Sequence, residues 1–301
     1  MPRLLVTTFE RLLQVDLGAD HALRRVSVLH EGLGIYFGLA QKDRRIWVAE
    51  RNLDIHKQRR VADAPVNGIT LWRRGLLGGL RRTGATITDP SFDDLHQIAH
   101  DRGTLFVTTG RAPFLVRHDP ATGRTVGVEI EAVLPDHLRR PDAANPDKYH
   151  FNSVVNLGGR LWVLAHNWDQ PSFAVGMDLA PAREGRAENV QIVEGLGSCC
   201  HDVLPAFGAL WVLDSGGAAL VRVGPEGMTR YPVDGEGQQA FPRGLARMGD
   251  RLVLSYGFWA AEREARVNSA SVLRVFDPVS EVMGPPMSLG QHGNTCAILA
   301  L

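Results

Sequence analysis

Cysteine is scarce in this chain of 301 residues, which contains three, at Cys199, Cys200 and Cys296. An odd number with one adjacent pair does not make a disulfide framework, so we expect reduced thiols and a cytoplasmic location. Long hydrophobic runs are also missing, because no stretch approaches the ~20 apolar residues that span a bilayer. The first residues carry too short an apolar run for a signal peptide. These absences argue against a secreted or membrane-embedded protein.

An excess of charge of either sign is absent as well. Lysine plus arginine and aspartate plus glutamate each number 33, so the formal net charge is +0 at pH 7. Nucleic acids and anionic membrane surfaces are bound mainly through basic patches, so we expect neither as a partner. The expected partner is a small-molecule substrate, and the oligomeric state is left open.

What the sequence does contain is a repeated unit. A short apolar run recurs at residues 3–8, 45–49, 104–108, 160–164, 208–217 and 251–255. The aligned residues in these runs are Leu4, Ile46, Leu105, Leu161, Leu210 and Leu252, which follow one another at intervals of 42 to 59 residues. Six units of this size are typical of a six-bladed β-propeller.

We therefore predict an all-β protein in which residues 1–301 form a single propeller domain. The last segment, 292–301, has no second strand after it, and its natural partner is the strand at 4–8. This pairing of the C-terminal strand with the N-terminal strands would close the ring and remove exposed sheet edges. Two segments lack the repeat pattern: 133–149 is predicted to be a loop on the face where substrate enters, and 260–268 a short helix.

The innermost strand of each propeller blade lines the central channel. Counting back nine residues from each aligned residue locates one inward position per blade, at Phe37, His96, Asn152, His201, Arg243 and Cys296. Because side chains alternate along a strand, Asp94, His150 and Cys199 also point inward, each two residues before one of these positions. His292 precedes Cys296 by four residues and is predicted to share its strand face.

Histidines from distant parts of the chain are thus predicted to meet in the channel. His96, His201 and His292 fall in alternating blades, and imidazole is a common ligand for divalent metals. Three such ligands leave coordination positions open for water or substrate, as in catalytic sites. We predict a divalent metal ion, zinc or iron, held by these three, with His150 as a rival third ligand or a general base. The alternative is that His96 and His201 are ordinary hydrogen-bonded channel residues.

This pattern resembles the peptidyl-α-hydroxyglycine amidating lyases, which are six-bladed propellers of the NHL type. That family holds zinc with three histidines from alternating blades, beside an arginine and a tyrosine. The spacing of His96, His201 and His292 carries the resemblance, which implies lyase chemistry. Tyr149 and Tyr36 are the nearest candidates for the tyrosine. The family's secretory signal and disulfides are missing from this sequence.

Other polar residues near the channel have two interpretations each. Arg243 is predicted to hold a carboxylate or phosphate of the substrate, or else to form a salt bridge within the ring. Asp94 and Asp202 either accept hydrogen bonds from the histidines or cap strand ends. The segment 166–168, His-Asn-Trp, is assigned to a loop, with a place at the pocket rim as the alternative.

Together these patterns predict a metal-dependent enzyme, first a lyase that acts on a small anionic substrate, with His150, Tyr149 and Arg243 as catalytic residues. Metal-dependent hydrolysis and, with iron, oxygen-dependent cleavage are alternatives within the same class. A non-catalytic propeller that binds a ligand or a protein is the alternative from another class. A calcium-dependent lactonase ranks lowest, because Asn152 is the one oxygen donor in the strict inner register.

Overall fold

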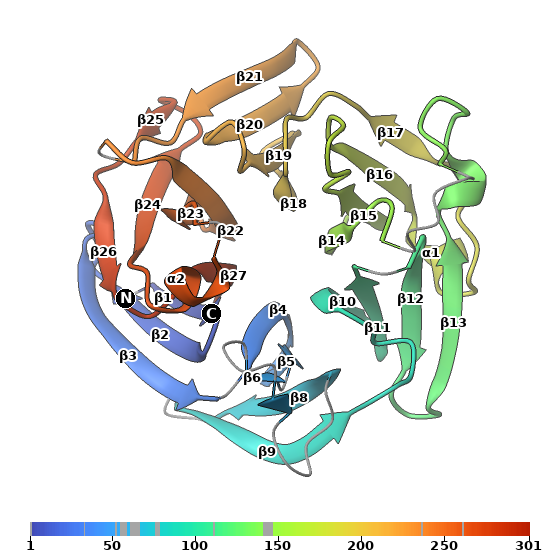
Figure 1. Cartoon of the computed structure of the whole chain (residues 1–301), viewed down its shortest axis with the longest axis horizontal. Helices are drawn as coiled ribbons and strands as arrows, with labels where there is room; N and C mark the ends of the chain where they lie inside the picture. Colours follow the sequence, from blue (N-terminus) through green and yellow to red (C-terminus); the bar gives the residue numbers. More distant parts are fainter. Residues whose placement is uncertain are drawn as a thin grey trace.

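The computed structural model describes residues 2–32, 34–51, 53–54, 59–60, 67–75, 79–110, 112–140, 147–235, 237–260 and 262–301. Six antiparallel sheets stand around a central axis as the blades of a propeller (Figure 1). The predicted six-bladed all-β fold is therefore confirmed. Among the described residues, no helix combines the length and hydrophobicity needed to cross a bilayer.

Each blade runs from a first strand at the channel to a last strand at the outside of the ring. Blade one contains β27 (Thr295–Ala300), β1 (Arg3–Thr8), β2 (Arg11–Leu17) and β3 (Leu23–Glu31). Blade two contains β4 (Ile35–Lys42), β5 (Arg45–Arg51), β8 (Asn67–Arg74) and β9 (Leu80–Ile87). Blade three contains β10 (Leu95–Asp101), β11 (Thr104–Thr109), β12 (Phe114–Asp119) and β13 (Arg124–Glu129).

The remaining blades follow the same plan. Blade four contains β14 (Phe151–Leu157), β15 (Arg160–Ala165), β16 (Phe173–Asp178) and β17 (Gln191–Val193). Blade five contains β18 (His201–Ala206), β19 (Ala209–Asp214), β20 (Ala219–Gly224) and β21 (Gly227–Pro232). Blade six contains β22 (Ala240–Met248), β23 (Arg251–Phe258), β24 (Ser271–Asp277) and β25 (Val282–Met283), and β26 (Met287–Gly290) also pairs with β24.

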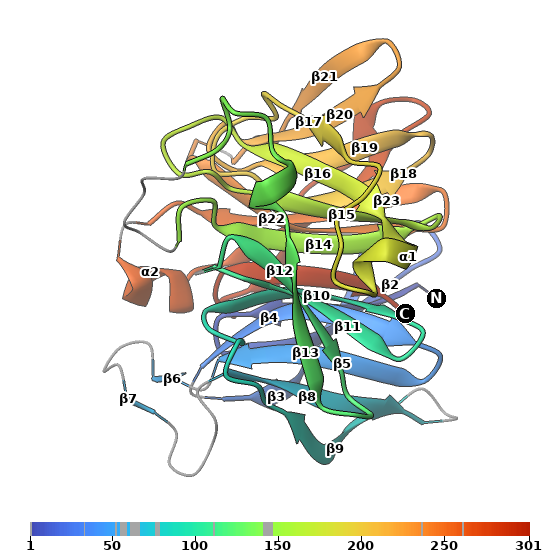
Figure 2. The same cartoon turned by 90° about the vertical axis from the view of Figure 1, so that its right-hand side faces the viewer.

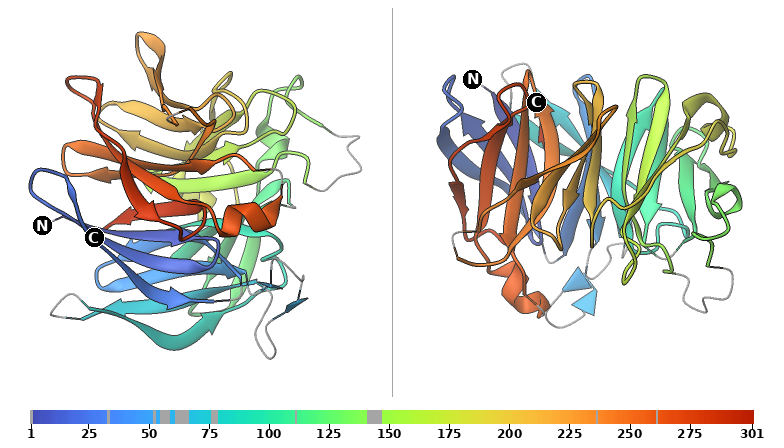
Figure 3. Two further views of the ribbon diagram at one scale, coloured as in Figure 1. Left: turned by 60° about the vertical axis from the view of Figure 1, so that its left-hand side comes forward. Right: turned by 90° about the horizontal axis from the view of Figure 1, so that it is seen from above.

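A few short elements lie outside the blades. They are the strand pair β6 (Leu53–Asp54) and β7 (Arg59–Arg60), the 3-10 turn η1 (Glu131–Val133), and the helices α1 (Leu179–Ala182) and α2 (Arg263–Val267). Helix α2 confirms the short helix predicted within 260–268. In side view, α2 and the β6–β7 pair project from one face of the ring, and the labelled chain ends lie toward the other (Figures 2 and 3).

The ring closes through its first and last strands. β27 pairs antiparallel with β1, with Leu4 opposite Ala300 and Val6 opposite Ile298. The two ends of the chain consequently lie in the same blade (Figure 1). The predicted closure by the C-terminal strand is confirmed, and pairing on both sides of β1 leaves it no open edge.

Blade packing buries the second strand of each sheet on both faces. Every residue of β11 is buried, and in β15 and β19 every residue after the first is buried. Trp47, Trp162 and Trp211 occupy the same repeat position and are 6%, 8% and 1% exposed. Their rings fill the space between neighbouring blades, where large aromatic groups contribute most to the core.

The innermost strands share one irregularity near their start. The pairing register shifts between Tyr36 and Leu39, Leu95 and Ile98, Phe151 and Ser153, His201 and Val203, and Pro242 and Leu245. Such bulges redirect side chains locally. Beyond the shift, Ile98 pairs with Val107 and Val203 with Val212, so His96 and His201 occupy equivalent positions in blades three and five.

Candidate metal centre

A cavity of about 470 Å³ opens at the channel end nearest α2. Four histidines line it, namely His96, His150, His166 and His201. Three arginines and a wall of aromatic rings complete the lining. This volume lies within the range of pockets that bind small molecules.

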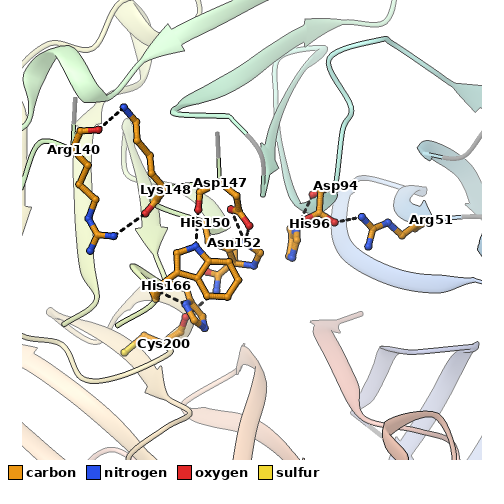
Figure 4. Close-up of polar contacts among 11 residues, drawn as sticks. Arg51, Asp94, His96, Arg140, Asp147, Lys148, His150, Asn152, His166 and Cys200 are labelled. Carbon is orange, nitrogen blue, oxygen red and sulfur yellow. Dashed lines mark hydrogen bonds and ion pairs between the residues drawn. The ribbon is translucent and has the colours of Figure 1, made fainter. Parts of the chain in front are cut away.

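The four histidines form a continuous arc along the cavity wall. Ring centroids are 4.7 Å apart for His96 and His150, 5.3 Å for His150 and His166, and 5.6 Å for His166 and His201. Figure 4 shows the first three with their polar partners. Two of the four come from strands β10 and β18, and the other two from turns at the cavity end of β14 and β15. The predicted convergence of His96 and His201 on one cavity is confirmed.

Hydrogen bonds fix the orientation of the first two rings. His96 donates from Nδ1 to the backbone carbonyl of Asp94, at 2.7 Å. His150 donates from Nδ1 to the carboxylate of Asp147, at 2.9 Å. A donor at Nδ1 leaves the lone pair on Nε2, which is the form that binds a metal. Burial and the charges of His150 and Arg243 lower the pKa of His96 to about 3, so this ring is neutral at pH 7.

The rings of His201 and His166 carry their protons on different nitrogens. The hydroxyl of Ser215 donates to the carbonyl of Pro242, at 2.6 Å, and therefore accepts from Nδ1 of His201, at 2.8 Å. Nε2 of His201 consequently keeps its lone pair. Nδ1 of His166 instead accepts the backbone N–H of Trp168, at 3.2 Å, so His166 carries its proton on Nε2. Burial, above all other causes, lowers the pKa of His166 to about 3 and that of His201 well below the usual value.

Asp94, His96 and His150 have the spacing of a metal site. One ligand atom from each lies within 4.8 Å of the other two, and no other such group of three occurs in the described part of the chain. Ligand atoms around a bound zinc or iron ion are roughly 3.4 Å apart, so small side-chain shifts would complete the site. Two imidazoles and one carboxylate suit zinc and iron(II), and Arg51 pairs with the Asp94 carboxylate. The donor set fits a divalent ion.

Arg243 faces the arc from blade six. Among the described residues its guanidinium has no hydrogen-bond or ion-pair partner, and its Nε is buried without one. Its charge is among the causes that lower the pKa values of His96, His166 and His201. A half-buried guanidinium without an ion-pair partner among the described residues is a good site for a carboxylate or phosphate.

Backbone strain accumulates at the same level of three adjacent blades. One residue just before the inner strand of each of blades three, four and five has a positive φ angle. These residues are Asp94, His150 and Cys199, with φ angles of 52°, 48° and 52°. Residues other than glycine rarely adopt this left-handed region, which costs about 1–2 kcal/mol. Strained positions of this kind cluster at functional sites. The strain turns the side chains of Asp94, His150 and Cys199 into the cavity.

We expect Cys199→Gly to leave the free energy of unfolding within about 1 kcal/mol of the parent value, because glycine adopts a positive φ without penalty. Cys199→Val is expected to lower it by about 2 kcal/mol, because a β-branched residue is most strained there. Urea unfolding followed by circular dichroism measures both. Equal destabilisation by the two variants would show that the thiol, not the backbone, stabilises this turn.

His292 and Tyr149 are not brought to the cavity. His292 precedes β27 in a turn where Gly293 and Asn294 donate to the backbone of Ser269 and Arg266. The chain is not a strand there, so His292 does not share the face of Cys296, and the charges near it are those of Arg11 and Glu31. This corrects the predicted placement of the third ligand.

Tyr149 lies in the core between blades three and four. It is 1% exposed, its hydroxyl donates to Glu131 at 2.8 Å, and it accepts the backbone N–H of Arg140 at 3.0 Å. The positive φ of His150, 48°, turns the chain just before β14, so that His150 enters the cavity while Tyr149 packs into the core. The hydroxyl is engaged in holding the 133–149 loop, and this corrects its predicted catalytic position. Residues 141–146 of that loop lie outside the described residues.

The two aspartates predicted beside the histidines differ in role. Asp94 orients His96 through its backbone carbonyl. Asp202 accepts from the backbone N–H of Gly244, at 2.7 Å, and from Nε2 of Gln97, at 3.2 Å, so its carboxylate joins three blades and does not orient a histidine. Burial raises its pKa to about 6.

The sequence pattern placed His166 and Trp168 in a loop and did not single out Arg51. A signal for these residues existed. Counting forward five residues from the aligned position of each repeat gives Phe9, Arg51, Gly110, His166, Ser215 and Gly257. Phe9, Arg51 and His166 line the cavity, because the second strand ends at the same face where the inner strand begins.

The fold and the cavity define a six-bladed β-propeller with a histidine-lined channel. No protein-family model matches the chain, and a comparison with curated protein sequences finds no match either. Solved structures do match. A chain in the crystal structure of a nidogen/laminin complex has a TM-score of 0.67 at 14% identity, over 100% of this chain and 98% of that chain.

Two further structures are bacterial. A protein from Lactobacillus plantarum has a TM-score of 0.56 at 11% identity, with 100% of both chains covered. A candidate 6-phosphogluconolactonase from Bacteroides fragilis NCTC 9343 has a TM-score of 0.56 at 10% identity, over 100% of this chain and 98% of that chain. At such low identity the likeness establishes the fold alone.

Proposed function

We propose that this protein is a metal-dependent enzyme that acts on a small anionic substrate inside the propeller channel. One observation carries the proposal: Asp94, His96 and His150 present metal-ligand atoms within 4.8 Å of one another in a cavity of small-molecule size. We further propose that residues 1–301 act as one cytoplasmic domain. The resemblance to NHL-type amidating lyases belongs to this proposal only in part, because His96 is the one expected histidine in the proposed set, and His150 and Asp94 stand in place of His201 and His292.

The residues around the cavity would have separate roles in metal binding, substrate binding and proton transfer. Asp94, His96 and His150 would hold a zinc or iron ion, which supplies Lewis acidity toward a substrate oxygen. Arg243 binds the anionic group of the substrate. His201 would accept a proton at Nε2, because its Nδ1 is fixed as a donor to Ser215; its pKa is lowered by burial and by the charge of Arg243, and an anionic group bound to Arg243 would remove the second cause.

Lyase chemistry needs a base and a hydrogen-bond donor on one substrate. His166 supplies the donor, because its Nε2 carries the proton. Its ring centroid lies 5.6 Å from that of His201, the base, so both reach one bound molecule. This pair supports elimination as the first reaction to test. Hydrolysis would use the same base on a water molecule, and product analysis separates the two.

Elemental analysis of the purified protein tests the metal centre. We expect about one zinc or iron per chain, and a higher melting temperature with metal than after chelation. The double variant His96→Ala with His150→Ala should lose the metal and this temperature shift while it keeps the β-sheet circular dichroism spectrum. The control is His21→Ala with His137→Ala, which changes two histidines outside the cavity and should retain metal.

Two outcomes would contradict the proposal. If the wild-type protein takes up no zinc or iron(II) and its melting temperature is unchanged by them, the protein is a ligand-binding propeller without a metal centre. If the double variant retains metal at the parent stoichiometry, the centre lies elsewhere in the chain.

A further inference from the structure

The cavity has an apolar side opposite the histidines that the metal centre does not use. Phe37 lies against His96, with ring centroids 4.8 Å apart, and Phe241 lies against His201, at 5.4 Å. Phe9 and Ile35 line the same cavity. A small polar substrate would leave this surface in contact with water, so its presence points to a ligand with an apolar part.

Trp259 extends this apolar side to the cavity mouth. Its ring lies 5.1 Å from that of Phe241, and the guanidinium of Arg266 lies over the indole at 4.9 Å. Trp259 is nevertheless 51% exposed and Trp168, which lines the same cavity, is 43% exposed, whereas Trp47, Trp72, Trp162 and Trp211 are each 8% exposed or less. An indole held by a neighbouring ring and a cation, with half its surface open, is a stacking platform for a flat apolar group.

The anion site and the platform are adjacent. Phe241 and Arg243 are two residues apart in β22 and both line the cavity. A ligand with its anionic group on Arg243 and its ring against Phe241 and Trp259 would lie next to His201, because His201 contacts Phe241. The reacting atoms would then sit between the apolar side and the histidine arc.

We propose that the ligand of this site is an aromatic acid, meaning a flat ring that carries a carboxylate or phosphate. The ring stacks on Trp259 and Phe241, and the anionic group binds Arg243. This inference rests on the proposed function for the reaction, but ring recognition can be measured without activity.

Calorimetric binding of two pairs of probes tests the ring. Phenyl phosphate should bind the protein as purified about tenfold more tightly than inorganic phosphate, and benzoate about tenfold more tightly than acetate. Benzoate and acetate share a carboxylate, and the two phosphate probes share a phosphoryl group, so most of any metal coordination cancels in each ratio. Binding of the aromatic probes should also reduce acrylamide quenching of the two exposed indoles that line the cavity, Trp259 and Trp168, and the part of this protection that disappears in Trp259→Ala reports Trp259.

The chain offers a matched control variant. Phe207 is an exposed aromatic residue, 37% exposed, with the guanidinium of Arg247 over its ring at 4.6 Å, but it does not line the cavity. Trp259→Ala should reduce the tenfold preference to about twofold, and Phe207→Ala should leave it unchanged. Phe241→Leu provides a second test at the same platform. Arg243→Gln should weaken both members of each pair by about the same factor.

Equal affinity for aromatic and non-aromatic probes would overturn the inference, and so would a preference that survives both Trp259→Ala and Phe241→Leu. Metal content is measured on the same samples. Stoichiometric metal without ring preference removes the aromatic substrate and leaves the proposed enzyme. Ring preference in a protein without metal supports an aromatic-acid site and removes the proposed metal chemistry.

Discussion

Gly110→Ala is expected to weaken metal binding at least tenfold and to lower the free energy of unfolding by about 1–3 kcal/mol. A methyl group on Gly110 would lie 2.2 Å from Oδ2 of Asp94 and 3.0 Å from Cε1 of His150. Its backbone N–H also donates to the carbonyl of Asp94, at 2.9 Å. The glycine therefore permits the close approach of two proposed ligands, and any larger residue must push them apart.

Metal titration followed by melting temperature measures this effect. Gly79→Ala is the matched control, because a Cβ there meets no atom within 4 Å and neither glycine has a positive φ. The control should keep both stability and metal affinity. Normal metal binding by Gly110→Ala would show that Asp94 and His150 do not act together on one ion.

Asp202→Asn is expected to raise the free energy of unfolding, relative to the parent protein, by about 3 kcal/mol more above pH 6 than at pH 4. Burial raises the pKa of this carboxyl from 3.8 to about 6, and a tenfold change in proton affinity corresponds to about 1.4 kcal/mol. Asp202 lies in the channel wall beside a second cavity of about 260 Å³ at the far end. An asparagine can still accept the N–H of Gly244 without carrying a buried charge.

The sign follows from proton binding. A group whose pKa is higher in the folded state contributes stability that is present below pH 3.8 and is lost as the pH rises through 6. The difference in unfolding free energy, variant minus parent, should therefore rise between pH 4 and pH 6 and then level off. Urea titrations at several pH values measure it.

Asp119→Asn is the control with the opposite sign. The pKa of Asp119 is lowered, first by a hydrogen bond from the Thr122 hydroxyl and then by one from the backbone N–H of Ala121. Its contribution is lost as the pH falls, so the corresponding difference should rise toward acid. A flat difference for Asp202→Asn would mean that this carboxyl is solvated in the folded protein.

The propeller was predictable because the blade is a local unit repeated six times. Each second strand is buried on both faces, so it reads as a continuous apolar run, and Leu105, Leu161 and Leu210 mark it without reference to the rest of the chain. The nine-residue count to His96 and His201 succeeded because the hairpins share one length and one bulge. Blade closure followed from the lone strand that contains Cys296.

The residues of the proposed metal centre could be predicted from the sequence only in part. His150 was recognised as a rival ligand because it lies two residues before Asn152 on an inner strand. The predicted placement of His292 was wrong because this residue precedes β27 in a turn, where strand alternation does not apply. His166 lies after a second strand, and its direction depends on the hydrogen bond between its ring and the backbone of Trp168. Such contacts between turns are set by tertiary packing, which sequence spacing does not encode.

Joining β27 to β1 has a consequence for how this molecule is made. Val6 pairs with Ile298, 292 residues later in the chain, and closing a loop of about 290 residues costs about 5 kcal/mol of chain entropy. On the ribosome, β27 emerges after every other strand of the ring, so the circle is completed after translation of the other blades. Blades three and four, which carry Asp94, His96 and His150, emerge well before that moment. A metal ion captured by the nascent chain would fasten these two blades together before the circle is complete.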